Sequence, residues 1–174
     1  MELERPDKVT AGAVGEPGQR TFFIQAREGE RTLTIVVEKE QVELLATSIL
    51  EILATVGAET GEGPAEDALE LEPPLEPLWR AGRLSIGYAE DRDRMLFELE
   101  ELVERANEED PDPDLPEPGR VRIWATREQM LALSRHGAAV AARGRPRCRF
   151  CGNPMDPAGH ACPAMNGHRE IAGR

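Results

Sequence analysis

Alternating apolar and polar residues predict a β-hairpin near the start of the chain. Residues 20–38, with the sequence RTFFIQAREGERTLTIVVE, contain two β-rich runs on either side of a turn around Gly29. In the second run Leu33 and Ile35 alternate with threonines, as in a half-buried strand. Residues 1–19 are polar and interrupted by glycine and proline, so we expect an irregular lead-in there.

A helical period follows in residues 39–57. Its apolar residues recur at steps of three and four, which places them on one face of an α-helix, and Gly57 is a typical end signal. The predicted apolar face consists of Val42, Leu45, Ile49, Ile52, Leu53 and Val56.

A second hairpin is predicted in residues 78–102, with its turn at the sequence EDRD. The apolar residues of its second arm fit both the period of a strand and that of a helix. The alternation of Met95, Phe97 and Leu99 favours a strand over residues 94–100.

The pattern after this hairpin predicts one more strand and one more helix. Residues 120–125, RVRIWA, have the composition of a strand. Residues 126–144 have a helical pattern, and Thr126 and Gln129 stand at the spacing of a capping box.

An internal similarity links the two strand-to-helix junctions. The segments LTIVVEKEQVELL and VRIWATREQMLAL align at an offset of 88 residues, which pairs Ile35 with Ile123 and Leu45 with Leu133. The alignment predicts a duplicated strand-strand-helix unit, and chance similarity between two such junctions is the alternative. In either case the predicted fold class is α+β, a mainly antiparallel sheet with helices on one face.

Two acidic segments separate these elements. Residues 58–77 hold seven acidic residues, four prolines and no basic residue, and residues 107–118 have the same character. We expect both to be solvated linkers or long loops. The predicted organisation is therefore a lead-in (1–19), an α+β body (20–143) and a small C-terminal segment (144–174).

Charge and cysteine content narrow the function classes. The net charge of −12 disfavours a surface that binds nucleic acid or anionic membranes as a whole. Residues 143–174 differ from the rest because they hold six arginines and two acidic residues. No apolar run reaches the roughly 18 residues of a membrane helix, and the first residues lack the profile of a signal peptide. Three cysteines clustered near the C-terminus favour a metal in a reducing compartment over disulfides, so we expect a cytoplasmic protein without membrane contact.

The last part of the chain contains five candidate metal ligands. Cys148 and Cys151 form a C-x2-C pair followed by glycine, which is the spacing of a zinc knuckle. His160 and Cys162 are two residues apart, so both side chains lie on one side of an extended segment. His168 follows six residues after Cys162.

Zinc is the metal that this residue set favours. Soft thiolates together with imidazole select Zn²⁺, and three cysteines with one histidine complete a closed tetrahedral site. The preferred ligands are Cys148, Cys151, His160 and Cys162, and the alternative has His168 in place of His160. A set of free thiols on a disordered tail and a redox C-x-x-C pair are the competing interpretations. Residues 144–174 are therefore predicted to form a small zinc ribbon. We expect Phe150, between the first two cysteines, to pack against the body or within this ribbon.

No catalytic motif of a known type is present in the sequence, and no catalytic residue is predicted. If the chain is an enzyme, the residues that would line a pocket between sheet and helices are Gln19, Arg20, Arg83 and Tyr88.

Four ordered motifs resemble one family. They are GEPGQRTFFIQA, LWRAGRLSIGYAEDRDR, REQM and GRPRCRFCGNPMDPAGHACPAMNGHR. Together they are similar to the DUF3090 family, which is common in actinobacteria and has no established activity. The resemblance implies that the C-x-x-C-G and D-P-x-G-H-x-C-P elements supply the metal ligands, and it favours His160 over His168. The chain departs from the family pattern at Arg149, Phe150 and Ala164.

The leading hypothesis is a small cytoplasmic zinc-binding protein that acts as a protein-interaction or regulatory adaptor with a structural zinc site. It predicts a protein partner of unknown identity. The alternatives are an enzyme with a pocket in the α+β body, and nucleic-acid contact through the arginine-rich ribbon.

Overall fold

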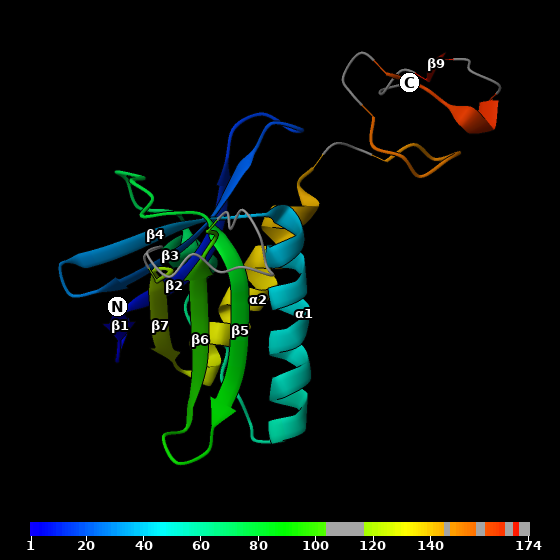
Figure 1. Cartoon of the computed structure of the whole chain (residues 1–174). Helices are drawn as coiled ribbons and strands as arrows, with labels where there is room; N and C mark the ends of the chain where they lie inside the picture. Colours follow the sequence, from blue (N-terminus) through cyan, green and yellow to red (C-terminus); the bar gives the residue numbers. More distant parts are fainter. Residues whose placement is uncertain (104–116, 145–146, 156–158, 166–168, 171–174) are drawn as a thin grey trace, which may run out of the picture. The chain divides into compact units, whose positions relative to one another are not determined.

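The computed structural model describes residues 1–103, 117–144, 147–155, 159–165 and 169–170 (Figure 1). The chain divides into two compact units, which differ from the predicted domains. The first consists of residues 1–14 and 21–141, and the second of residues 15–20 and 142–174. The predicted acidic loop at 107–118 lies almost wholly outside the described residues.

The first sheet consists of β2 (Lys8–Val14), β3 (Thr21–Glu28) and β4 (Arg31–Val37), all antiparallel and in that order. The predicted hairpin is confirmed, and Gly29 has the positive φ of +59° that its turn requires. The expected irregular lead-in is wrong, because β2 pairs with β3 along its whole length. The inward side chains of β2 are mostly alanine, which gave the strand only a weak apolar alternation.

The second sheet has the order β1-β7-β6-β5. Its strands are β1 (Glu2–Leu3), β7 (Arg120–Ala125), β6 (Arg94–Glu101) and β5 (Ala81–Ala89). The β1 strand is parallel to β7, and the other pairs are antiparallel. The second hairpin and the strand assignment of residues 94–100 are confirmed. The segment forms a strand and not a helix, because this places the alternate residues Met95, Phe97 and Leu99 on one face, where all three are fully buried in the core.

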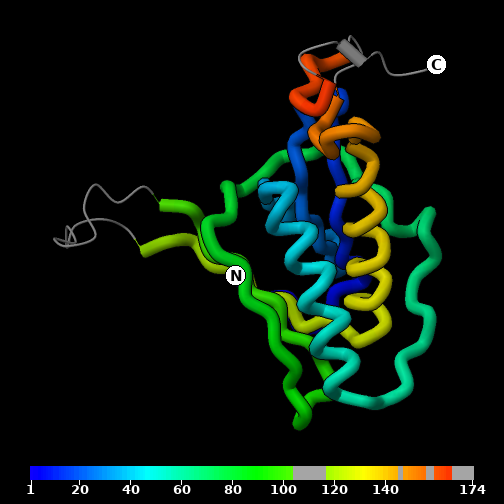
Figure 2. Tube along the Cα trace, turned by 90° about the vertical axis from the view of Figure 1, so that its right-hand side faces the viewer, coloured from blue at the N-terminus to red at the C-terminus, as the bar shows by residue number. Residues whose placement is uncertain are grey.

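Two helices cover the same face of this strand framework, α1 (Lys39–Val56) and α2 (Arg127–Ala142). Figure 2 shows them side by side, and the Ser134 hydroxyl of α2 donates a 2.7 Å hydrogen bond to the Ala46 carbonyl of α1. One hydrophobic core joins both helices to both sheets. The predicted α+β class with helices on one face is therefore confirmed. Within the described residues, no helix has the length and apolar character needed to cross a membrane.

The two halves of the first unit repeat the same element order. Strands β2-β3-β4 precede α1, and strands β5-β6-β7 precede α2, so each repeat has one strand more than predicted. Both helices begin with a capping box. Glu38 pairs with Gln41 at α1, and Thr126 pairs with Gln129 at α2, 88 residues later in each case.

Each repeat also extends a segment into the other one. The Arg122 amide of β7 donates to the Met1 carbonyl (2.9 Å), and the Val36 amide of β4 donates to the Trp79 carbonyl (3.0 Å). The segment before the first strand of each half therefore joins, in parallel, the last strand of the other half. This reciprocal exchange supports a duplication over chance similarity.

The acidic segment 58–77 is anchored more firmly than a solvated linker. Its central part, residues 64–73, is called the strap here and contains the 3₁₀-helix η1 (Glu66–Leu69). The strap lies against the face of β2-β3-β4 that points away from the helices, and Leu69 is only 3 % exposed. Most acidic side chains of the strap remain exposed, so the expectation of a solvated loop holds for them but not for its backbone.

Candidate metal centre

The first two predicted ligands lie on a tight turn in the second unit. The Gly152 amide donates to the Cys148 carbonyl and the Cys148 amide donates to the Asn153 carbonyl, both at 2.8 Å. Gly152 has a φ of +74°, which L-residues with a side chain rarely adopt. The glycine after the second cysteine therefore closes the turn that brings Cys148 and Cys151 together.

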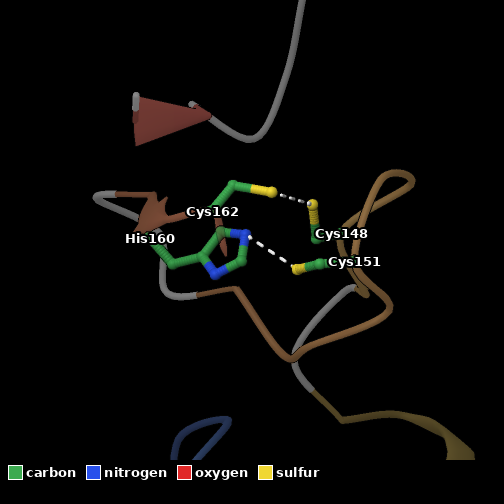
Figure 3. Close-up of side chains that lie close together, drawn as sticks. All are labelled: Cys148, Cys151, His160 and Cys162. Atoms are coloured by element: carbon green, nitrogen blue, oxygen red, sulfur yellow. Dashed lines mark hydrogen bonds between the residues drawn. The ribbon is translucent and has the colours of Figure 1, made fainter. Parts of the chain in front are cut away.

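The other two candidate ligands lie in a short strand and directly after it. Gly159 has a φ of +82° and precedes β8 (His160–Ala161), which pairs with β9 (Arg169–Glu170). Cys162 follows β8 directly and starts the turn into the 3₁₀-helix η2 (Pro163–Met165). Because His160 and Cys162 are two residues apart in extended chain, both face the cysteine turn (Figure 3).

The four ligand atoms lie at distances that suit one metal ion. All of them are within 4.8 Å of one another. The Sγ atoms of Cys148 and Cys162 are 3.7 Å apart, and the Cys151 Sγ is 3.7 Å from the Nε2 of His160. Tetrahedral coordination with Zn–S bonds of about 2.3 Å would separate two sulfurs by roughly 3.8 Å. Cys148, Cys151, His160 and Cys162 can therefore hold a metal ion, as the sequence predicted.

A small apolar cluster surrounds these ligands. Cys148 and Cys162 are 2 % and 0 % exposed, and they pack with the buried side chain of Met155 and the half-buried Met165. The Phe150 amide points at the Cys148 Sγ, 3.4 Å away, an orientation that stabilises a thiolate. The cluster thus combines burial with a polar group directed at sulfur. Sequence reasoning missed the two methionines, because their spacing follows no regular period.

Two expectations around the centre have different outcomes. His168, the alternative ligand, lies outside the described residues, so the structure does not compare it with His160. The expectation for Phe150 is wrong, because its side chain is 49 % exposed. The Arg149 guanidinium lies 4.7 Å from the centre of the Phe150 ring, so a cation–π contact takes the place of packing in a core.

The four residues proposed for an enzymatic pocket do not form one within the first unit. Gln19 and Arg20 belong to the second unit. Arg83 and Tyr88 are both in β5 but on opposite faces, because Tyr88 packs against the core whereas Arg83 lines a surface hollow of about 230 Å³. The Tyr88 hydroxyl donates to the Asp93 carboxylate (2.7 Å), which Arg127 also contacts (2.9 Å). These contacts lower the pKa of Asp93, chiefly through the hydrogen bond from Tyr88, and raise the pKa of Tyr88.

Comparison with known proteins identifies a family and no closer relative. The model of a family described as "Protein of unknown function (DUF3090)" matches residues 1–162, which include all four ligands. No match was found among curated proteins or among solved structures.

Proposed function

The chain belongs to the DUF3090 family, and from that premise we propose that it is a zinc-binding adaptor whose second unit, held by structural zinc, contacts an acidic protein partner. The observation that carries the proposal is the convergence of three thiols and one imidazole within 4.8 Å. Three sulfurs and one nitrogen match the ligand preference of Zn²⁺ among the common biological metals.

A structural role for zinc follows from the number of ligands. Four protein ligands fill a tetrahedral shell, so no position remains for a substrate or an activated water. The free energy of metal binding at such a site stabilises the folded state, because the unfolded chain holds no preformed ligand set. In this role the metal fixes two turns that have a very small apolar cluster of their own.

The charge of the second unit supports an acidic protein as the partner. Residues 143–174 contain six arginines and two acidic residues, although the whole chain carries −12. Phe150 is half exposed beneath the Arg149 guanidinium at the tip of the cysteine turn. An exposed aromatic ring with arginine beside it is the residue combination enriched at protein interfaces.

Metal analysis of the wild type and of three histidine and cysteine variants tests the zinc site. We expect about one zinc per chain in the wild type and in His168→Ala, and a loss of zinc in His160→Ala and Cys162→Ser. His168→Ala is the matched control because it removes an imidazole from the same region. Loss of zinc in His168→Ala with retention in His160→Ala would show that the alternative ligand set is the correct one.

Capture from the native cytoplasm tests the adaptor role. We expect an acidic protein to be retained by the wild type and released by Arg149→Glu/Phe150→Ala, while the zinc content of that variant stays unchanged. A retained species that disappears on nuclease treatment would contradict the proposal and favour nucleic-acid contact. A ligand-dependent rise in melting temperature across a metabolite panel, without any captured protein, would instead favour the enzyme hypothesis.

A further inference from the structure

We infer that the face of β5-β6-β7 that points away from the helices binds an extended segment of a partner protein, as the strap binds the equivalent face of β2-β3-β4. The inference concerns the first unit alone and goes beyond the proposed zinc site. It rests on a comparison within the chain, because the duplication places the same kind of face in both halves and one of these faces is already occupied.

Strand register defines which positions of the two faces correspond. In the first half one row of paired residues across the sheet is Thr10, Gln25 and Thr34. In the second half the corresponding row is Ser85, Glu98 and Arg122. The neighbouring rows are Gly12, Phe23 and Val36 in the first half, and Gly87, Leu96 and Trp124 in the second.

The first face binds the strap through backbone hydrogen bonds and one apolar side chain. The Gln25 amide nitrogen donates to the Glu72 carbonyl (2.9 Å), and its oxygen accepts from the Glu72 amide (2.8 Å). The Thr10 hydroxyl donates to the Leu69 carbonyl. Gly12 leaves the space that Leu71 fills, since a Cβ there would lie 2.4 Å from the Leu71 Cγ. As a result Thr10 and Gln25 are at most 1 % exposed.

The second face repeats these features and is open over β5, whereas on β7 the Arg92 guanidinium lies 4.3 Å from the centre of the Trp124 ring, which is 8 % exposed. Gly87 corresponds to Gly12, and a Cβ built on it would meet no atom within 4 Å. Ser85 corresponds to Thr10 and is exposed, whereas Thr10 is fully buried. Next to Gly87, a hollow of about 230 Å³ lies over the Ser85 position and is lined by Arg83, Ser85, Glu98, Glu100 and Arg120.

The side chains of the open face can make the contacts that Gln25 makes to the strap. Glu98 stands where Gln25 does and can accept from a peptide N–H. Arg122 is its neighbour on β7, 3.9 Å from the Glu98 carboxylate, and can donate to a peptide carbonyl. The Glu98 carboxylate and the Arg122 guanidinium thus offer the acceptor and the donor that the Gln25 side chain offers to the strap. An acceptor and a donor side by side can bind the N–H and C=O groups of an extended backbone.

The same comparison defines the chemistry of the bound segment. Over Gly87 it carries an apolar side chain, as the strap carries Leu71, with Leu96 as the floor of the site. Glu72 of the strap forms ion pairs with Lys8 and Arg27, both at 3.2 Å. Arg83 occupies the position of Lys8, and Glu100 that of Arg27. Arg83 alone therefore selects an acidic residue next to the leucine-like one. Main-chain bonds supply affinity and the two side chains supply specificity, as in other modes of extended-peptide recognition.

A display library of random 12-residue peptides, together with a synthetic peptide of residues 64–75, tests the inference on the full-length protein. We expect the wild type to select peptides with an apolar and an acidic residue in succession, and Gly87→Leu to bind them at least tenfold more weakly. The Gly87→Leu side chain would occupy the site of the ligand, and the free space around Gly87 allows the variant to fold. An unchanged melting temperature checks this.

Two further variants sharpen the experiment. Arg31→Leu adds a similar apolar side chain at an exposed position of the other sheet and should bind the selected peptides as the wild type does. Glu98→Gln recreates the Gln25 arrangement and should bind the peptide of residues 64–75 more tightly than the wild type.

Three outcomes would overturn the inference. They are a failure of the wild type to select any peptide, equal binding of the selected peptides by Gly87→Leu, and a self-association of the wild type that Gly87→Leu abolishes. The last result would assign the face to a contact between copies of the chain. None of these measurements depends on zinc. A negative result for peptide binding is therefore distinguishable from a negative result for the proposed metal centre.

Discussion

At the scale of single residues, the two equivalent glycines Gly12 and Gly87 lie in different surroundings. Both occupy the same place in the first strand of their repeat, on the face away from the helices. Leu71 fills the space over Gly12, whereas the space over Gly87 is open. The requirement for glycine at position 12 therefore comes from the strap and not from the conformation of the strand.

Alanine substitution separates these two environments. Gly12→Ala should lower the free energy of unfolding by about 1–3 kcal/mol, because the added methyl group overlaps Leu71 and forces the strap to move. Gly87→Ala, the matched control, should change it by less than about 0.5 kcal/mol. Urea denaturation measures both values. An equal effect of the two substitutions would show that the strap yields to the methyl group without cost.

The surroundings of Asp93 predict that the stability of the fold depends on pH. Its pKa lies below the ordinary 3.8, first because Tyr88 donates a hydrogen bond to the carboxylate and then because Arg127 does. A lowered pKa means that the carboxylate form favours the folded state. The contribution is therefore complete above the ordinary pKa and is lost as the pH falls through the lowered one.

An NMR titration of the Asp93 carboxyl carbon checks this direction. Tyr88→Phe removes only the hydroxyl, so it should shift the pKa of Asp93 upwards, toward the ordinary value. If the pKa of Asp93 is the same in Tyr88→Phe, the interaction with Arg127 must dominate instead.

At the scale of elements, the start of each helix also connects the two repeats. Gln129 accepts from the Thr126 amide (2.9 Å) and donates to the Pro6 carbonyl just before β2 (2.7 Å). Gln41 accepts from the Glu38 amide (2.8 Å) and lies near the carbonyls at the start of β5, at 3.3 and 3.4 Å. Each capping glutamine therefore contacts the start of the other repeat, and the hydrogen bond that Gln129 donates is shorter than those of Gln41.

The two caps should differ in their contribution to stability. Gln129→Ala should lower the free energy of unfolding by about 1–2 kcal/mol, because it removes a cap and a short hydrogen bond to a backbone carbonyl. Gln41→Ala should have roughly half that effect, because its second contact is long. Chemical denaturation of both variants checks the order. A larger loss in Gln41→Ala would contradict the ranking from distances.

Prediction from sequence succeeded for elements with a strong period and failed where the period was weak. The helix at 39–56 and the strand at 94–101 carry large apolar residues at regular steps, so local pattern was sufficient. Strand β2 was missed because its inward side chains are small. The acidic composition of the strap predicts a solvated segment, although Gln25 and Thr10 hold its backbone. Such contacts join residues 47 and 59 positions apart, which no local period reveals.

At the scale of the whole molecule, the candidate metal ligands belong to one unit and the α+β core to the other. All four ligands lie between residues 148 and 162, and the main hydrophobic core is formed by residues 3–141. Among the described residues the core contains 23 buried side chains, whereas the cluster at the candidate ligands contains three. We therefore expect a bound metal to contribute to the stability of the second unit and not to that of the first.

Removal of the metal tests this division. Chelation, or Cys148→Ser, should move the amide resonances of the residues around the metal centre into the narrow range of chemical shifts that is typical of an unfolded chain. The melting temperature of the first unit should stay within about 2 °C of its original value. Heteronuclear NMR and calorimetry follow the two units separately. Joint unfolding of both units on chelation would mean that the metal centre is integral to the core.

The sequence by itself determined the fold class, the two hairpin-to-helix junctions, the offset of 88 residues between them and a set of candidate metal ligands in which His168 was the alternative to His160. These features depend on neighbours within a few residues, where period and spacing are sufficient. Only the tertiary structure decided that each repeat lends a segment to the other, and that the strap occupies one of two equivalent sheet faces. Those properties depend on which distant backbone groups meet, and burial of polar groups with partners far along the chain leaves no periodic trace in the sequence.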